Sequence, residues 1–344
     1  MRIGAMFVVL SAQLFAVVAN GATEKPGDAT DQENPGSGTP PSAFIDRTQR
    51  RVNNLVLSSS QWFDSFFGST EVNRPGNVRR GSLRVGAQWD ERDGTRFIGR
   101  FKARLPLPAL QERSRLILGR GDADEFIDGS TTGTTDALPS QFNDFEDDEW
   151  LFGLGYSRNA RLARGFDFSA GIKVSSPIEP YVRATYRWNH AFREDVLWQL
   201  RPRVFWQDNR GTGASVNSII DHALNNRWML RNWTVLTAED AVEGLGWQHS
   251  FIAYQTLNSK TAYSYNLFAS GESDSLVDVE DYGVELRLRR RFAREYFFVE
   301  LSTRVNWPRF EVEERRSANF GVGIEFEMQF GDWPGRTAPT GLVD

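Results

Sequence analysis

The chain has 344 residues, a formal net charge of −5 and no cysteine. The missing cysteines exclude disulfides, thiol catalysis and a lipidated N-terminal cysteine, and the net negative charge argues against nucleic acid as a partner. Mean hydropathy is −0.46, and no apolar run long enough for a transmembrane helix follows the N-terminal segment. A helical membrane protein is therefore excluded. A transmembrane β-barrel is not, because its strands alternate apolar and polar residues.

The N-terminal residues form two segments that carry no folded core. Residues 1–22 contain a positive Arg2, an apolar run over residues 6–18 and small residues at 19–21, which together predict a cleaved signal peptide. The apolar run is too short for a membrane anchor. Residues 23–41 are rich in Pro, Gly, Asp and Glu, so they cannot bury enough apolar surface to offset chain entropy. We predict that they are disordered.

Residues 42–80 are predicted to hold an amphipathic helix and a connector. The helix begins near Ser42 and ends at Gly68, and its apolar residues recur at three- and four-residue spacing. The apolar stripe consists of Val52, Leu55, Val56, Phe63 and Phe66. If a barrel follows, the helix could brace its periplasmic mouth, plug its lumen or pair with a partner. All three interpretations stay open.

Residues 81–331 show the pattern of repeated strands. Apolar and polar residues alternate with a period of two, which places one kind on each face of a strand. The clear strands are residues 82–89, 96–107, 115–121, 150–156, 166–174, 181–188, 196–207, 262–271, 282–289, 297–307 and 319–330. Three more are predicted at 214–223, 228–236 and 245–256, where the phase of alternation is not fixed. The total of about fourteen is even, as expected of a bacterial barrel, and twelve to sixteen stays open.

The closing stretch, residues 319–330, alternates most clearly and is long enough to cross a bilayer as a tilted strand. Its apolar face is Phe320, Val322, Ile324, Phe326, Met328 and Phe330. A strand that ends in Phe near the C-terminus resembles the closing strand of the Gram-negative outer-membrane β-barrel superfamily. The resemblance implies location in the cell outer membrane and insertion by the barrel-assembly machinery, with Phe326, Met328 and Phe330 as the assembly signal. The tail, residues 332–344, departs from that pattern, in which the signal stands at the very end.

The connections also fit a transmembrane barrel. Short turns on one side and long loops on the other are typical of its periplasmic and extracellular faces. The short turns are 224–227, 257–260 and 292–295, and the long loops are 122–149, 272–281 and 308–318. Several short turns carry cations, namely Arg158, Arg161, Arg164, Arg227, Lys260 and Arg294. The acidic loop 122–149 lacks the spacing of a calcium loop. It is most simply a solvated surface, with cation-bridged lipopolysaccharide as the alternative.

The polar faces of the strands carry the strongest functional signal. In a barrel these faces line the lumen, because charge on the lipid face costs ~2–4 kcal/mol at mid-bilayer. The candidate lumen cations are Arg84, Arg96, Arg100, Lys102, Arg104, Arg115, Lys173, Arg183, Arg187, Arg201, Arg203, Arg287, Arg289 and Arg304, and the fewer acids are Asp167, Glu285, Glu300, Glu325 and Glu327. A surplus of guanidinium groups in an aqueous pore favours anions. A closed wall of Arg–carboxylate networks is the alternative.

Aromatic residues make up 13% of the chain, which suits interfacial girdles better than a soluble sandwich. The girdle candidates stand near strand ends: Trp89, Trp150, Trp188, Trp206 and Trp307. A soluble β-protein would show apolar residues on both faces of some strands, whereas here the second face is repeatedly Arg. The sequence therefore favours a membrane barrel.

An outer-membrane lipid hydrolase is the least favoured function. Such an enzyme needs a Ser or His near the extracellular rim, and the only histidines are His190, His222 and His249. Asp221 precedes His222 and Ser250 follows His249, so each pair points to opposite faces of a strand and cannot form a dyad.

We therefore predict an all-β, antiparallel, up-and-down barrel that passes small anionic solutes. The alternative is a structural or surface-interaction barrel without a through-pore. Expected partners are outer-membrane lipid, lipopolysaccharide, the barrel-assembly machinery and small solutes, with no nucleic acid. No cofactor, metal site or catalytic residue is predicted.

Overall fold

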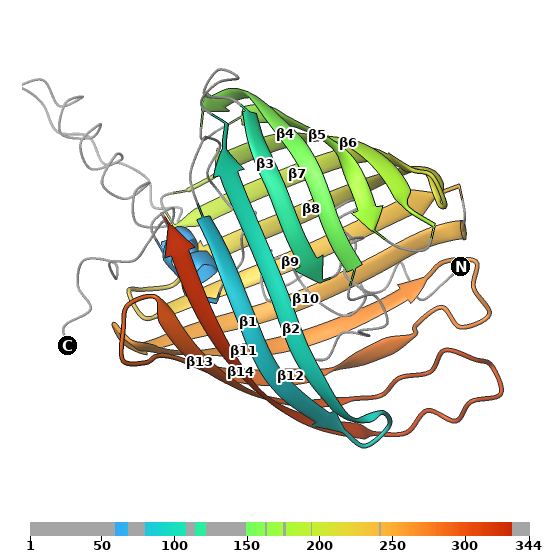
Figure 1. Cartoon of the computed structure of the whole chain (residues 1–344). Helices are drawn as coiled ribbons and strands as arrows, with labels where there is room; N and C mark the ends of the chain where they lie inside the picture. Colours follow the sequence, from blue (N-terminus) through green and yellow to red (C-terminus); the bar gives the residue numbers. More distant parts are fainter. Residues whose placement is uncertain are drawn as a thin grey trace, which may run out of the picture. The chain divides into compact units, whose positions relative to one another are not determined.

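A computed structural model describes the chain at residues 59–67, 80–107, 114–121, 149–161, 164–174, 177–193, 195–240 and 242–331. It contains a closed barrel of fourteen antiparallel strands, in which sequence neighbours pair and β14 pairs with β1 (Figure 1). The strands are β1 (Arg80–Asp90), β2 (Gly94–Pro106), β3 (Ser114–Gly121), β4 (Glu149–Arg161), β5 (Arg164–Val174), β6 (Glu179–Ala191), β7 (Val196–Gln207), β8 (Gly211–Ala223), β9 (Trp228–Glu239), β10 (Val242–Asn258), β11 (Thr261–Glu272), β12 (Asp281–Arg291), β13 (Phe297–Asn306) and β14 (Asn319–Gly331). The predicted fold class and strand number are confirmed.

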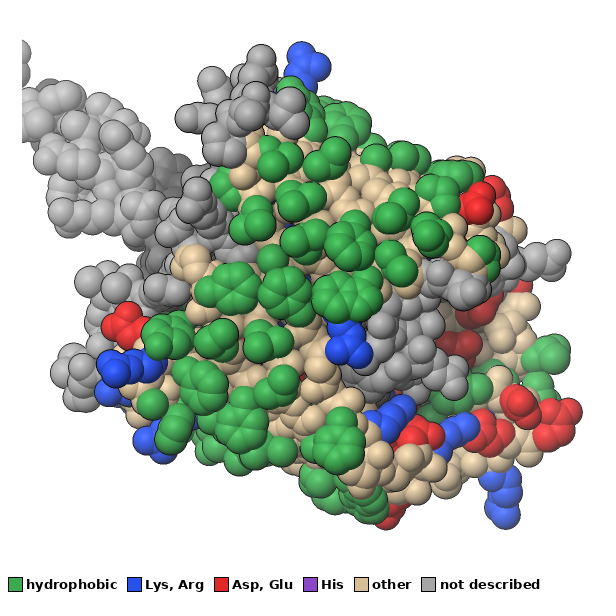
Figure 2. Space-filling model, in the orientation of Figure 1, with side chains coloured by type: hydrophobic (Ala, Val, Ile, Leu, Met, Phe, Trp, Pro, Cys, Tyr) green, Lys and Arg blue, Asp and Glu red, His purple; other side chains and the backbone are tan. Residues whose placement is uncertain are grey.

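The two faces of the barrel wall follow the alternation of the sequence. In β6 the side chains of Tyr181, Arg183 and Arg187 point inward and are buried, while Val182 between them is exposed on the outside. The outer face is strongly apolar, with Phe97 82% exposed. Hydrophobic side chains cover much of it (Figure 2). An apolar exterior around a polar interior is the arrangement of a transmembrane barrel, because a soluble barrel would bury its apolar face.

For strands β8 to β10, only the structure shows which side chains point into the barrel. Ile219, Trp233 and Ile252 point inward and are at most 1% exposed, so this part of the inner wall is apolar. Both faces of these strands therefore carry apolar residues, and alternation alone could not tell inside from outside. Ile252 packs in one cluster with the helix of residues 59–67, whereas Ile219 and Trp233 pack with Val235 in a separate inward cluster.

The barrel has two distinct ends. We call the end where β1 begins and β14 finishes the terminal end, and the opposite one the loop end. The short turns 224–227, 257–260 and 292–295 lie at the terminal end, and the connections 273–280 and 307–318 lie at the loop end, as predicted. Arg158, Arg161 and Arg164 are not turn residues, because β4 and β5 extend further than their alternation predicted.

The barrel closes through β1 and β14, which pair from Arg80–Gly331 to Asp90–Gly321. Phe326 and Met328 face outward, each 38% exposed. The ring of Phe330 covers Gly81, where an added Cβ would lie 2.2 Å from ring atoms, so only glycine fits beneath it. The role of these three residues in assembly stays a prediction.

The predicted signal peptide, the linker, most of the loop 122–149 and the tail 332–344 lie outside the described residues. Of the predicted helix, residues 59–67 are described and are helical. Among described segments, no helix has the length and hydropathy that spanning a bilayer requires.

Candidate functional site

The helix of residues 59–67, hereafter the inner helix, lies inside the barrel at its terminal end (Figure 1). Its four aromatic residues, Trp62, Phe63, Phe66 and Phe67, are at most 3% exposed. Their rings pack against Tyr254 of β10 and Phe298 of β13, with centroid separations of 4.9 to 5.4 Å. Burial of this aromatic cluster is the main apolar contribution to the free energy that holds the helix inside the barrel.

The predicted apolar stripe included Phe63 and Phe66 but missed Trp62 and Phe67. A stripe at helical spacing describes one buried face. A helix enclosed by a barrel wall is covered on several sides, so side chains next to the stripe are buried as well. Val52, Leu55 and Val56 lie outside the described residues.

The polar side of the inner helix is fixed by a buried ion cluster. Arg231 of β9 is fully buried, and its guanidinium donates to Asp221 of β8 at 2.6 and 2.9 Å and to Asp64 of the helix at 2.7 Å. Ser60 donates from its hydroxyl to Asp221 at 2.7 Å. Removing one partner from such a cluster leaves a buried charge uncompensated, which is strongly unfavourable.

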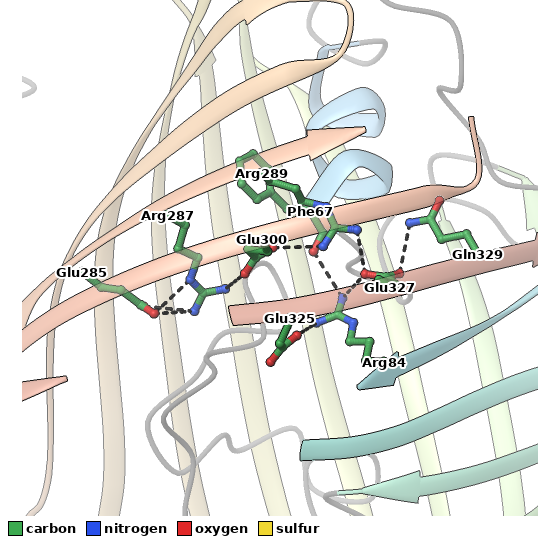
Figure 3. A network of polar contacts seen from close by, with 9 residues as sticks. All are labelled: Phe67, Arg84, Glu285, Arg287, Arg289, Glu300, Glu325, Glu327 and Gln329. Carbon is green, nitrogen blue, oxygen red and sulfur yellow. Dashed lines mark hydrogen bonds and ion pairs between the residues drawn. The ribbon is translucent and has the colours of Figure 1, made fainter. Parts of the chain in front are cut away.

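A ladder of alternating charges follows the inner wall from β12 to β1 (Figure 3). The side chains run in the order Glu285, Arg287, Glu300, Arg289, Glu327, Arg84, with separations of 2.9, 3.5, 3.0, 2.6 and 3.0 Å, all at most 6% exposed. One member, Arg84, donates to the backbone oxygen of Phe67 in the inner helix, and the neighbouring Gln329 donates to that of Ser65. This part of the wall is an Arg–carboxylate network, as the structural alternative required.

The opposite wall, β5 to β7, is different. Arg183 donates to the Ser169 hydroxyl at 2.8 Å, and Arg203 donates to the Thr185 hydroxyl at 3.2 Å. Arg201 donates to the amide oxygen of Gln199 at 3.0 Å. On the described inward positions of β5 to β7 cations outnumber acids, whereas the charge ladder holds three of each, so this wall has the more positive potential. The cations are Lys173, Arg183, Arg187, Arg201 and Arg203, and the acids are Asp167 and Glu179.

All predicted lumen residues lie on the inward face of their strands. These are Arg84, Arg96, Arg100, Lys102, Arg104, Arg115, Lys173, Arg183, Arg187, Arg201, Arg203, Arg287, Arg289 and Arg304, with Asp167, Glu285, Glu300, Glu325 and Glu327. The prediction missed inward residues at strand ends and in strands of unfixed phase: Asp90, Glu179, Asp221, Arg231, Glu239 and Asp281. For Asp90, Glu179 and Asp281 the signal was an extension of the same alternation by one or two residues. Asp221, Arg231 and Glu239 became identifiable only once the phase of β8 and β9 was fixed. The role of the whole set in selectivity stays a prediction.

A cavity of about 630 Å³ opens inside the loop end, hereafter the vestibule. Its lining is polar, with Arg96 paired to Asp90 at 3.1 Å and Arg304 paired to Asp281. The lining also includes Arg92, Asp93, Arg210, Glu239, Glu272 and Glu280. Acids outnumber bases here, so the mouth and the β5–β7 wall have opposite electrostatic character.

Glu280, in the connection between β11 and β12, is expected to make anion passage pH-dependent. Burial raises its pKa, and the nearby carboxylates of Glu272 and Asp281 raise it further. Because the folded-state pKa is raised, the charged form costs stability at neutral pH, and this cost disappears as the pH falls through the raised value. Acidification should therefore neutralise Glu280 at a higher pH than an ordinary glutamate and increase anion preference.

The substitution Glu280→Gln should increase anion preference at neutral pH and remove part of its pH dependence. The change in anion preference should be roughly twofold or less, because salt screens a half-exposed charge. Reversal potentials at several pH values would measure it. A matched substitution, Asp208→Asn, changes an exposed acid of the β7–β8 turn and should leave the pH profile unchanged. Equal pH profiles in the original chain and in the Glu280→Gln variant would contradict the assignment.

The three histidines lie on the outer face of the barrel or at its terminal end. His190 stacks between Trp188 and Phe192, His222 contacts Asp195 at 2.8 Å and His249 contacts the Thr234 hydroxyl at 2.9 Å. None of these contacts joins a histidine to a serine hydroxyl. In the described part of the chain, no three His, Asp or Glu side chains are placed to hold a metal ion.

The girdle candidates fall at two levels on the outer face. Trp89, Trp150, Trp206 and Trp307 lie at the loop end, where Trp307 stacks on Tyr282 at 5.5 Å. Trp188 lies at the terminal end, 4.9 Å from Trp198. The prediction missed Trp198 and Trp228, which have the same outward orientation. Their function as membrane-interface anchors stays a prediction.

Comparison with known proteins gave structural similarity only. No family model matches the chain, and no curated protein does. Among solved structures it is similar to the anion-selective porin from Comamonas acidovorans (7% identity, TM-score 0.44, 74% of this chain and 99% of that one). It is also similar to a loop-deleted OmpT, an outer membrane protein of Vibrio cholerae (10%, 0.44, 74% and 100%), and to the KdgM porin in complex with disordered oligogalacturonate (8%, 0.36, 72% and 99%).

Identities and TM-scores at this level carry no argument about function, so the assignment rests on the molecule itself. Its sheet is closed, its exterior is apolar and its interior is polar and charged. The chain is a closed, fourteen-stranded antiparallel β-barrel with the apolar exterior and polar interior of a transmembrane barrel.

Proposed function

We propose that this barrel is a passive outer-membrane channel that favours small anionic solutes, with the inner helix as its plug. The observation that carries the proposal is the surplus of inward cations on the β5–β7 wall, where Arg183, Arg201 and Arg203 are among five cations that stand with two acids in the described strands. A fixed cationic surface in a water-filled passage concentrates anions and repels cations. The vestibule at the loop end supplies the entry for a solute from that side.

A second candidate is a structural barrel that conducts nothing. The seating of the inner helix supports it, because the aromatic cluster and the Arg231 ion cluster hold the helix inside the terminal end. The two candidates differ in whether the helix leaves the lumen. Conduction requires it to move, whereas a structural barrel keeps it in place.

Reversal potential in a KCl gradient across a planar bilayer tests the channel proposal. Openings of the full chain, and of a variant without the inner helix, should show chloride preference. The double variant Arg201→Gln/Arg203→Gln removes two charges from the β5–β7 wall while keeping polar side chains. Its reversal potential should move toward zero.

The matched control is Arg164→Gln/Arg290→Gln, which neutralises two arginines on the outer face of β5 and β12. It should leave the reversal potential unchanged. Cation preference in the original chain, or identical potentials in all three proteins, would refute the role of this wall.

A further inference from the structure

The rims of the two barrel ends carry opposite charge among the described residues. At the terminal end the exposed charged side chains are Arg158, Arg164, Arg193, Arg227, Lys260, Arg290 and Arg294, with Glu295 as the exposed acid. At the loop end they are mainly acids: Glu91, Asp93, Asp208, Asp240, Asp274, Asp278, Glu311 and Glu313, with Arg92 and Arg315. We call the seven terminal-end cations the basic rim.

The cations of the basic rim make no side-chain contacts that would stabilise the described part of the barrel. None of the seven has a side-chain hydrogen bond, ion pair or ring contact with a described residue. Arginines of the lumen, by contrast, are held in ion clusters or by neutral acceptors. An exposed arginine without such contacts is available to an external anion. Its planar guanidinium can donate two parallel hydrogen bonds to a phosphate.

A repeated pair of residues indicates which anion the rim meets. Four described turns of the terminal end each carry an exposed apolar side chain and, one to three residues later, an exposed cation. The pairs are Phe192 with Arg193, Leu224 with Arg227, Leu257 with Lys260, and Phe292 with Arg294, and the apolar members are 45% to 57% exposed. An apolar group beside a cation fits the boundary between acyl chains and headgroups, where the first enters the apolar layer and the second stays at the phosphates.

The position of the rim supports the same conclusion. It lies at and just beyond the outward aromatic residues of this end, since Arg164 pairs with Trp188. Trp188, Trp198 and Trp228 are the predicted membrane-interface anchors of this end. Arg158, Arg164 and Arg290 are on outward-facing strand positions, so the groups next to them are lipid and not solvent alone. Basic side chains at this depth attract anionic lipids through the surface potential.

We propose that the basic rim is a docking surface for the phosphate headgroups of anionic phospholipids in the leaflet at the terminal end. The inference is independent of whether the barrel conducts. It assigns a leaflet preference to the barrel, because the acidic loop end repels the lipids that the basic rim attracts.

Quenching of tryptophan fluorescence by brominated lipids tests the proposal on the full chain. The protein is refolded in phosphatidylcholine vesicles that contain an equal mole fraction of either brominated phosphatidylglycerol or brominated phosphatidylcholine. Stronger quenching by the phosphatidylglycerol is expected at low salt, and the difference should shrink at high salt. Each rim cation removed should lower the preference by about twofold to fivefold.

Two matched double variants locate the effect. Arg227→Gln/Lys260→Gln removes two cations from the basic rim, and Arg92→Gln/Arg315→Gln removes two from the loop end. The first should lower the preference and the second should not, with folding of each checked by heat-modifiable gel mobility. Equal quenching by the two lipids in the original chain would overturn the proposal. So would an equal loss in both variants, which would indicate a response to net charge alone.

Discussion

Deletion of residues 59–67, with the ends rejoined by a flexible linker of equal length, is expected to raise the conductance of the barrel severalfold in planar bilayers. The inner helix lies inside the terminal end of the barrel, where Trp62, Phe66 and Phe67 are at most 1% exposed. Its removal takes these side chains out of the lumen and should widen the passage. The measurement is single-channel conductance of the original and shortened chains under the same salt conditions.

A milder variant tests the same point without a deletion. Phe63→Ser/Phe66→Ser removes two rings that contact Tyr254 and Phe298 but keeps the chain length. It should give frequent openings of intermediate duration, because the ion cluster around Arg231 still holds the helix. Deletion of residues 310–316, in a connection at the loop end, is the control for loss of chain and should not remove the closure.

Unchanged conductance after deletion of the inner helix, with the barrel folded, would contradict its role as a plug. The structural-barrel candidate would then be favoured. A large steady conductance in the original chain would also contradict it, since the passage would be open with the helix in place.

The substitution Asp221→Asn should destabilise the folded barrel by about 1–3 kcal/mol. Asp221 accepts two hydrogen bonds from Arg231 and one from Ser60, and all three side chains are at most 3% exposed. The amide removes one of the two carboxylates that compensate the buried guanidinium, so Asp64 remains as its charged partner, and the new NH2 group cannot accept from the buried donors. The midpoint of urea unfolding in lipid vesicles, followed by tryptophan fluorescence, would measure the loss.

The matched control is Arg92→Gln at the loop end. Arg92 pairs with Glu314 at 2.8 Å, a geometry as close as that of the buried cluster, but the side chains are 40% and 28% exposed. Exposed pairs contribute about 0–1 kcal/mol, so this variant should unfold close to the original chain. Similar losses in both variants would show that burial does not set the strength of the Arg231 cluster.

Alternation predicted most of the barrel because it is a local property of each strand. Residues 196–207, for example, already show Trp198, Leu200 and Val204 against Gln199, Arg201 and Arg203. In lipid the outer face of a barrel must be apolar, so this two-residue period identifies both the strand and its outer side. The inward position of the predicted arginines follows from the same rule.

The same rule failed where the inner wall is itself apolar. Residues 211–258 carry Ile219, Trp233 and Ile252 on the inside, so the two faces of β8 to β10 differ little in hydropathy. A period of two identifies a face only when the faces differ. The inner helix, which stands far from these strands in the sequence, accounts for the inward Ile252, and a separate inward cluster of Ile219, Trp233 and Val235 accounts for the others.

The sequence by itself determined the strands, their apolar exterior and the cationic character of the interior, because these depend on neighbours within a strand. Only the tertiary structure decided that Arg289 meets Glu300 and Glu327 while Arg203 meets Thr185, because such partners depend on strand register around a closed sheet. It also decided that the helix lies in the lumen. An apolar stripe shows that a helix buries one face, whereas the surface that receives it forms only when distant strands close into a barrel.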